Sequence, residues 1–229
     1  MFHNIILADE INRGTPKTQA SLLECMEEFQ VTVDGETRPV PRPFFVMATE
    51  NPIEFHGTYP LPEAQLDRFL LKIGLGYPSK LEEMSIMDSQ RLQHPLGTIS
   101  SVSSVEEVLM MQSVSRHVYL DDSIKGYIVD IVARTRSHPA VQLGASPRGS
   151  LGIMRASQAK SFLAQRDFVI PDDVKFVAEG VLCHRLILKP EEAVSGVSPA
   201  QIASQVIASV PVPVTCLLYT SPSPRDRTR

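Results

Sequence analysis

Two short apolar runs, each ending in polar residues, constrain the fold of this chain most strongly. The first run is Ile5-Ile6-Leu7-Ala8 before Asp9-Glu10, and the second is Phe44-Phe45-Val46-Met47-Ala48 before Thr49-Glu50-Asn51. Continuous apolar runs of this length are typical of strands buried on both faces, as in parallel sheets. Parallel strands need crossover connections, which are usually helices, so the pattern predicts an α/β fold with a parallel sheet.

The segments between and after these runs continue the alternation. Thr15-Pro16 supplies a helix cap and a proline at the first helical position, and an apolar stripe follows at helical spacing. The Asp34-Gly35 pair inside residues 31–37 predicts a β-hairpin. We expect a further helix from Pro62 through Phe69 and a third short strand at residues 70–73.

Beyond Tyr77-Pro78 the strand patterns fade and helices dominate. Helix starts are predicted at Asp121, at Ser146-Pro147 and at Pro171. We therefore expect an α/β domain at 1–78 and an all-α domain at 79–210. Residues 211–229 lack any period and are expected to be disordered. From Cys216 they resemble vector read-through, so we expect this tail to be partly non-native and assign it no function.

Composition and charge exclude several classes of protein. Lys and Arg number 22 against 26 Asp and Glu, so a chain-wide basic surface for nucleic acid is absent. No apolar run approaches the roughly 20 residues that span a bilayer, and the first residues do not form a signal peptide. Three cysteines without CxxC spacing indicate neither disulfides nor a zinc site. We expect a cytoplasmic protein without membrane insertion, and a buried Cys183 beside a surface His184.

The polar residues at the two strand ends are the first candidates for chemistry. Asp9, Glu10 and Asn51 should lie on one edge if the strands are parallel. One carboxylate could then hold magnesium, the next could polarise water, and the amide of Asn51 could orient that water. Asp, Glu and Asn also end strands simply because they suit turns, so this pattern alone leaves both interpretations open.

Two arginines add to the candidates. Arg68 follows the helix that begins at Pro62, where it could reach a neighbouring subunit's phosphate or pair locally with Asp67 or Glu63. Arg148 lies in the first turn of a predicted helix, next to the positive helix end. That position is unfavourable for a cation unless an anion is bound there, although a solvated surface arginine remains the alternative.

Four segments together resemble the MoxR family of AAA+ ATPases, in the order in which that family has them. Residues 5–13 resemble its Walker B segment, 47–52 its sensor 1 strand, 57–69 its arginine-finger segment and 145–149 its sensor 2. The hairpin at 31–40 is similar to the pre-sensor 1 hairpin of that clade. The likeness runs from the first residues to about Pro211.

The resemblance implies a P-loop NTPase fold followed by a helical lid, and it implies roles for five residues. Asp9 would serve magnesium, Glu10 would activate water, and Asn51 would position it. Arg68 would reach a neighbour's nucleotide, and Arg148 would read the γ-phosphate in its own subunit or in the neighbour's. The family uses ATP and Mg²⁺ in homo-oligomeric rings, commonly hexamers, for chaperone-like remodelling or maturation of client proteins.

The departure from the family is the absence of a phosphate loop. No G-x-x-x-x-G-K-[ST] occurs in the sequence, and Gly144–Ser150 lacks the lysine. We therefore expect an N-terminally truncated fragment that is inactive alone and binds ATP weakly, with an exposed sheet edge. The alternative is a non-catalytic binding module that docks onto full-length subunits or a client.

Overall fold

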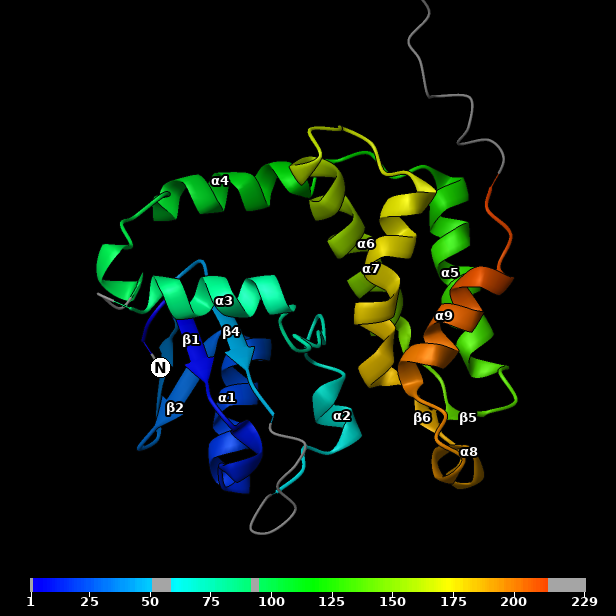
Figure 1. The fold of residues 1–229 in the computed structure, drawn as a ribbon, viewed down its shortest axis with the longest axis horizontal. Coiled ribbons are helices and arrows are strands. Elements are labelled where there is room, and N and C mark those ends of the chain that lie inside the picture. The colour runs from blue at the N-terminus through cyan, green and yellow to red at the C-terminus, as the bar shows by residue number, and fades with distance from the viewer. Residues whose placement is uncertain (1, 51–58, 92–94, 214–229) are drawn as a thin grey trace, which may run out of the picture.

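The computed structural model describes residues 2–50, 59–91 and 95–213, which form an α/β part and a helical part side by side (Figure 1). We call residues 5–69 the α/β part and residues 118–210 the helical part, because the buried hydrophobic clusters fall within these two ranges. The predicted fold class, a parallel sheet with helices followed by a helical lid, is confirmed. The boundary near Pro78 and the ranges 1–78, 79–210 and 211–229 stay predictions.

The α/β part is built on two parallel strands that are distant in the sequence. Strand β1 (Ile5–Ala8) pairs with β4 (Phe45–Ala48), with Ile5 opposite Phe45 and Ala8 opposite Ala48. The connection contains the 3-10 turn η1 (Ile11–Arg13) and helix α1 (Pro16–Glu28). The Thr15 hydroxyl caps α1 by accepting from the Thr18 amide, as the sequence predicts.

The expectation that both strands are buried on both faces is wrong. Their burial alternates, and Ile5, Leu7, Phe45 and Met47 are all exposed on one face. The other face packs on α1, where Leu22 and Leu23 form a small core with Ile11 and Leu61. A continuous apolar run shows that the side chains on both faces of a strand are suited to burial. Among the described residues, only the face that packs on α1 is covered.

The predicted hairpin is confirmed. Strand β2 (Gln30–Val33) pairs antiparallel with β3 (Glu36–Pro39) through a turn at Asp34-Gly35. Both turn residues have positive φ angles, 51° and 79°, which the tight primed turns require and which Asp and Gly tolerate. The hairpin packs back onto α1 through Val31, which is buried with Cys25 and Val40.

The chain after β4 differs from the prediction. Helix α2 (Glu63–Leu66) is one turn long, so Arg68 lies just beyond it, and residues 70–73 form no strand. Instead, the Lys72 amide donates to the Gly180 carbonyl (2.8 Å), so this segment docks on a helix of the other part. The Leu70 side chain lies beside Gly152 and the Leu71 side chain beside Gly180, where an added Cβ would be in ordinary contact at 3.5 Å.

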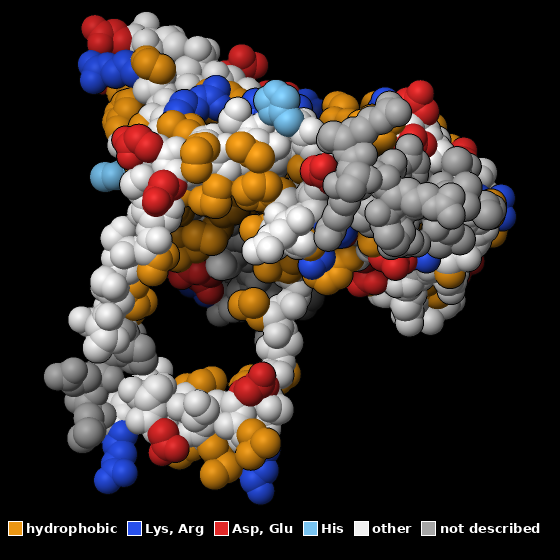
Figure 2. Space-filling model, turned by 90° about the horizontal axis from the view of Figure 1, so that it is seen from above, with side chains coloured by type: hydrophobic (Ala, Val, Ile, Leu, Met, Phe, Trp, Pro, Cys, Tyr) orange, Lys and Arg blue, Asp and Glu red, His pale blue; other side chains and the backbone are white. Residues whose placement is uncertain are grey.

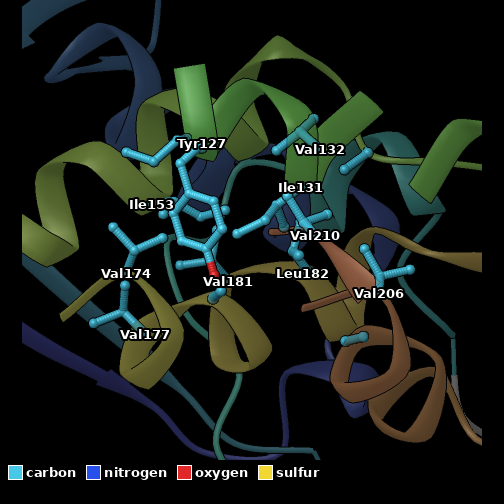
Figure 3. Packing of buried hydrophobic residues seen from close by; sticks show 14 of the residues in the cluster. Tyr127, Ile131, Val132, Ile153, Val174, Val177, Val181, Leu182, Val206 and Val210 are labelled. Atoms are coloured by element: carbon cyan, nitrogen blue, oxygen red, sulfur yellow. The ribbon is translucent and has the colours of Figure 1, made fainter. Parts of the chain in front are cut away.

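The helical part packs its helices around one large hydrophobic core. Its centre is formed by α5 (Asp122–Arg136), α6 (Pro147–Leu163), α7 (Pro171–Leu182) and α9 (Pro199–Ser209). Figure 3 shows Ile131 and Ile153 meeting Val181 and Leu182 at the centre of this core. The caps at Asp121 and Ser146 and the proline at 171 start these helices where the sequence predicts.

Smaller elements complete the helical part and link it to the α/β part. The expected all-α composition misses a two-stranded antiparallel sheet of β5 (Val141–Leu143) and β6 (Ile187–Leu188). Five further elements are helical: α3 (Lys80–Ser89), η2 (Pro95–Thr98), α4 (Val105–Ser115), η3 (Cys183–Arg185) and α8 (Pro190–Val194).

Helices α3 and α4 contribute no residue to the hydrophobic cores of the described residues, although α4 contacts α6. Neither contains a buried residue, and most of their large apolar side chains are exposed. Figure 2 shows hydrophobic side chains around an open hollow on the face seen from above. Of the helices in the described ranges, none combines the length and the hydropathy that crossing a membrane requires.

A buried arginine joins the two parts. Arg185, whose side chain is 3% exposed, donates from Nε to the Asp67 carboxylate at 2.9 Å. Its Nη2 donates to the carbonyls of Asp67 (3.0 Å) and Phe69 (2.6 Å), and its Nη1 to the carbonyl of Leu70 (3.2 Å). One guanidinium therefore fixes the backbone from 67 to 70 against the end of α7.

His184 lies in the same junction, so the expectation of a surface histidine beside a buried cysteine is wrong. Cys183 is only partly buried, and the His184 ring meets the Phe69 carbonyl through Nε2 at 2.9 Å. Its Nδ1 is buried and has no hydrogen-bond partner among the described residues. Burial, assisted by the charge of Arg185, lowers the pKa of His184 to about 4, so the ring is neutral at pH 7.

Removing the Asp67 carboxylate should destabilise the junction strongly. We expect Asp67→Ala to lower the free energy of unfolding by about 3 kcal/mol, because a buried guanidinium loses its counter-charge. Urea unfolding of the 229-residue chain measures this. Asp130→Ala, at an exposed position on α5, is the control and should change the free energy by less than about 0.5 kcal/mol. Equal effects of the two substitutions would contradict the assigned role of Asp67.

Acid should weaken the same junction through His184. Because the pKa is lower in the folded chain, the unfolded chain binds more protons between pH 6.5 and 4, so stability falls as the pH falls through this window. The loss is at most about 3 kcal/mol. Urea midpoints across this range should fall less for His184→Asn than for the unmodified chain. His117→Asn changes an exposed histidine and should show the same pH dependence of the urea midpoint as the unmodified chain. The same pH dependence in all three proteins would contradict the role of His184.

Candidate functional site

The ends of β1 and β4 meet at one edge of the sheet, as the parallel pairing predicts. The Thr49 hydroxyl donates to the Asp9 carboxylate at 2.6 Å and accepts from the Glu10 amide at 2.8 Å. The backbone continues the pairing, since the Ile11 amide donates to the Thr49 carbonyl. Thr49 therefore holds Asp9 and Glu10 in fixed positions beside its own strand end.

Glu10 has an unusual backbone conformation at this edge. Its φ and ψ angles are 49° and 55°, in the left-handed region that a residue with a Cβ occupies rarely. The bonds from Thr49 to both sides of Glu10 maintain this strained conformation. The Glu10 carboxylate then pairs with Arg13 at 2.9 Å and stays partly open to solvent.

The third candidate of this edge cannot be placed. Asn51 falls within residues 51–58 and lies outside the described residues. Its neighbour Glu50 pairs with Lys72 at 3.4 Å, so the chain just after β4 reaches the segment that docks on the helical part.

Asp9 fits a magnesium ion that a nucleotide brings with it. Asp9 is exposed, and the Thr49 hydroxyl donates to one of its two carboxylate oxygens. Magnesium commonly takes one or two protein carboxylates and fills its other positions with water and phosphate oxygens. In the described ranges no group of three His, Cys, Asp or Glu side chains is placed to hold a metal ion.

The two candidate arginines converge on one carboxylate, Glu27, near the end of α1. Arg68 Nη2 lies 2.9 Å from one carboxylate oxygen of Glu27, and Arg148 Nη2 contacts the other. Neither local partner proposed for Arg68, Asp67 or Glu63, is the one it uses. The structure thus brings together two candidates that the sequence separates widely.

The start of α6 explains how Arg148 tolerates its position. The Ser146 hydroxyl accepts from the Arg148 amide at 3.1 Å and donates to the Asp67 carboxylate at 3.0 Å. The anion that a cation at this positive helix end requires is supplied by Glu27 of the other part. Asp67 therefore accepts hydrogen bonds both from Arg185 and from Ser146, the cap of the helix that carries Arg148. Arg68 is the residue that follows Asp67 in the chain.

A cavity of about 330 Å³ lies beside this group. Its charged lining consists of four arginines and two carboxylates, an excess of two positive charges: Arg68, Arg148, Arg155, Arg185, Glu27 and Asp67. Guanidinium groups bind carboxylate and phosphate oxygens through paired N–H donors. The arrangement can therefore bind a phosphate group.

Sequence reasoning misses four residues of this arrangement. Thr49, Glu27, Asp67 and Arg185 contribute through partners that are remote in the chain, up to 121 residues away for Glu27 and Arg148. The one sequence pattern that points to Glu27 is the arginine at a helix start, which requires an anion without identifying it.

Comparisons with known proteins identify two domain types in the chain. The family model described as "ATPase family associated with various cellular activities (AAA)" matches residues 1–71, and that of the AAA lid domain matches residues 133–206. The first match contains Asp9, Glu10 and Arg68, and the second contains Arg148 and Arg185.

Individual proteins match over most of the chain. An uncharacterized protein, YeaC of Bacillus subtilis, is 53% identical over 211 residues, which cover 92% of this chain and 66% of that protein. Chaperone MoxR1 of Mycobacterium tuberculosis is 41% identical over 219 residues, covering 92% and 58%. The chain therefore spans 58% to 66% of the length of these two relatives.

A solved structure supports the same fold. The structure of a candidate ATPase from Cytophaga hutchinsonii superimposes with a TM-score of 0.87 at 38% identity, covering 93% of this chain and 67% of that one. Together with the two family models and the MoxR relatives, this shows that the chain belongs to the MoxR family of AAA+ ATPases.

Proposed function

We propose that this chain contributes to ATP binding and hydrolysis in a ring-shaped MoxR-type ATPase that remodels or matures client proteins. The observation that carries the proposal is the convergence of Arg68 and Arg148 on a single acidic group beside a positively charged cavity. Two guanidinium groups held this close are suited to one multiply charged anion, such as the terminal phosphate of a nucleotide.

The edge formed by β1 and β4 is the proposed catalytic edge. Asp9 holds magnesium, which neutralises phosphate charge when it is bound with the nucleotide. Glu10 accepts a proton from the attacking water, and its carboxylate is free to do so once it leaves Arg13. Asn51 orients the same water, as the family resemblance implies.

The arginines complete a site in a neighbouring subunit. Arg68 and Arg148 share one carboxylate, so a nucleotide that reaches one of them meets the other. The contacts of Glu10 and Asp9 are instead with Arg13 and Thr49, which lie in their own strand-end group. We infer that the strand-end group serves the subunit's own nucleotide and the arginine pair serves the neighbour's, so that hydrolysis requires assembly.

Several finer features belong to the same proposal. The ring is a hexamer, the protein acts in the cytoplasm, and a client protein is the partner. The name of MoxR1, a chaperone, supports the remodelling of clients. The 229-residue chain lacks G-x-x-x-x-G-K-[ST], so by itself it binds ATP weakly and does not hydrolyse it.

Replacing Glu10 tests the proposal directly. In a complete MoxR-type chain that carries this sequence together with a phosphate loop, Glu10→Gln should keep ATP binding and lower turnover by about 10²- to 10⁴-fold, because the base is lost. Steady-state phosphate release and nucleotide binding measure the two quantities. Glu191→Gln, an exposed glutamate on α8, is the matched control and should leave both unchanged. Turnover of Glu10→Gln equal to the control would remove Glu10 from its role.

A further inference from the structure

Glu27 has no part in the roles considered so far, yet its carboxylate lies where Arg68 and Arg148 meet. One oxygen lies 2.9 Å from Arg68 Nη2 and the other contacts Arg148 Nη2. Each oxygen thus serves one guanidinium, which is how two oxygens of a phosphate would bind the same pair. The carboxylate carries one negative charge between two positive ones, so the group remains short of negative charge.

The position of Glu27 at a helix end favours its replacement by another anion. Glu27 lies in the last turn of α1, at the negative end of the helix, and α1 has no basic residue in that turn. A carboxylate there is disfavoured relative to an anion that belongs to no helix. Arg148 has the opposite mismatch at the start of α6, and the Glu27–Arg148 pair relieves both.

The group is also accessible without unfolding. The side chains of Glu27, Arg68 and Arg148 are 33%, 34% and 45% exposed, and the cavity opens beside them. Rotation of the Glu27 side chain into solvent would leave both guanidinium groups free at the cavity wall.

We propose that Glu27 is an internal counter-ion that occupies the phosphate position between Arg68 and Arg148 and is displaced by a nucleotide phosphate. The inference rests on the proposed function, in which these arginines bind a neighbour's nucleotide. Before assembly, Glu27 keeps the two like charges together and weakens their binding of free phosphate anions. When the neighbour's nucleotide arrives, its higher charge outcompetes the single carboxylate.

Pyrophosphate binding to the 229-residue chain tests this without any hydrolysis. At fixed ionic strength, calorimetry should show that Glu27→Gln binds pyrophosphate about tenfold more tightly than the unmodified chain, because the internal competitor is gone. Glu28→Gln removes the same charge from the adjacent exposed residue and should change binding less than about twofold. Equal effects of the two substitutions would overturn the proposal.

Two further variants make the test specific to the pair of arginines. Glu27→Gln combined with Arg68→Gln should lose the gain, whereas a retained gain would place the bound anion elsewhere and contradict the proposal. Glu27→Asp keeps the charge but shortens its reach, so it should bind pyrophosphate between the unmodified chain and Glu27→Gln. Glu27→Asp also tests the proposal if Glu27→Gln fails to fold. Pyrophosphate binding equal to that of the unmodified chain would then contradict the displacement of Glu27.

The pyrophosphate test of Glu27 and the turnover test of the proposed function can fail independently. Failure of the pyrophosphate test removes the displacement of Glu27 and leaves Glu10 and Asp9 in their proposed roles. Wild-type turnover in Glu10→Gln would count against the proposed catalytic edge, while the competition between Glu27 and pyrophosphate would stand on its own measurement.

Discussion

The arrangement of this molecule depends on the burial of one guanidinium group between its two parts. Arg185 donates to four acceptors in residues 67–70, of which the Asp67 carboxylate supplies the counter-charge, and to the Val181 carbonyl of its own part. A charge buried in this way is stable only if every partner keeps its place, so the pair tolerates little relative movement of the two parts. The chain that follows then lies against α6 and α7, with Leu70 beside Gly152 and Leu71 beside Gly180.

The position of the arginine pair follows from this junction. Asp67 accepts a hydrogen bond from Ser146, which caps the helix that carries Arg148, and Asp67 directly precedes Arg68 in the chain. The junction thus sets the distance between Arg68 and Arg148, and Glu27 neutralises part of their repulsion. The arginine pair therefore draws on residues of both parts, and the junction holds those residues together.

Local chemistry explains which features the sequence predicts well. The caps at Thr15 and Ser146, the helix start at Pro171 and the turn at Asp34-Gly35 depend on neighbouring residues, so they can be predicted from the local sequence. Roles for Asp9, Glu10 and Arg68 follow from family resemblance and stay predictions. The docking of residues 70–73, the burial of His184 and the partner of Arg68 depend on remote contacts, and no local pattern contains them.

The central claim is that Arg68 and Arg148 act together on a neighbour's nucleotide, and subunit mixing tests it most directly. In the complete ATPase, Glu10→Gln subunits retain both arginines, whereas Arg68→Ala or Arg148→Ala subunits retain the catalytic edge. Each arginine variant should be inactive alone, and mixing it with Glu10→Gln subunits should restore phosphate release, because some interfaces then contain all three groups. Recovery with Arg68→Ala but none with Arg148→Ala would show that Arg148 serves its own subunit and would contradict the account.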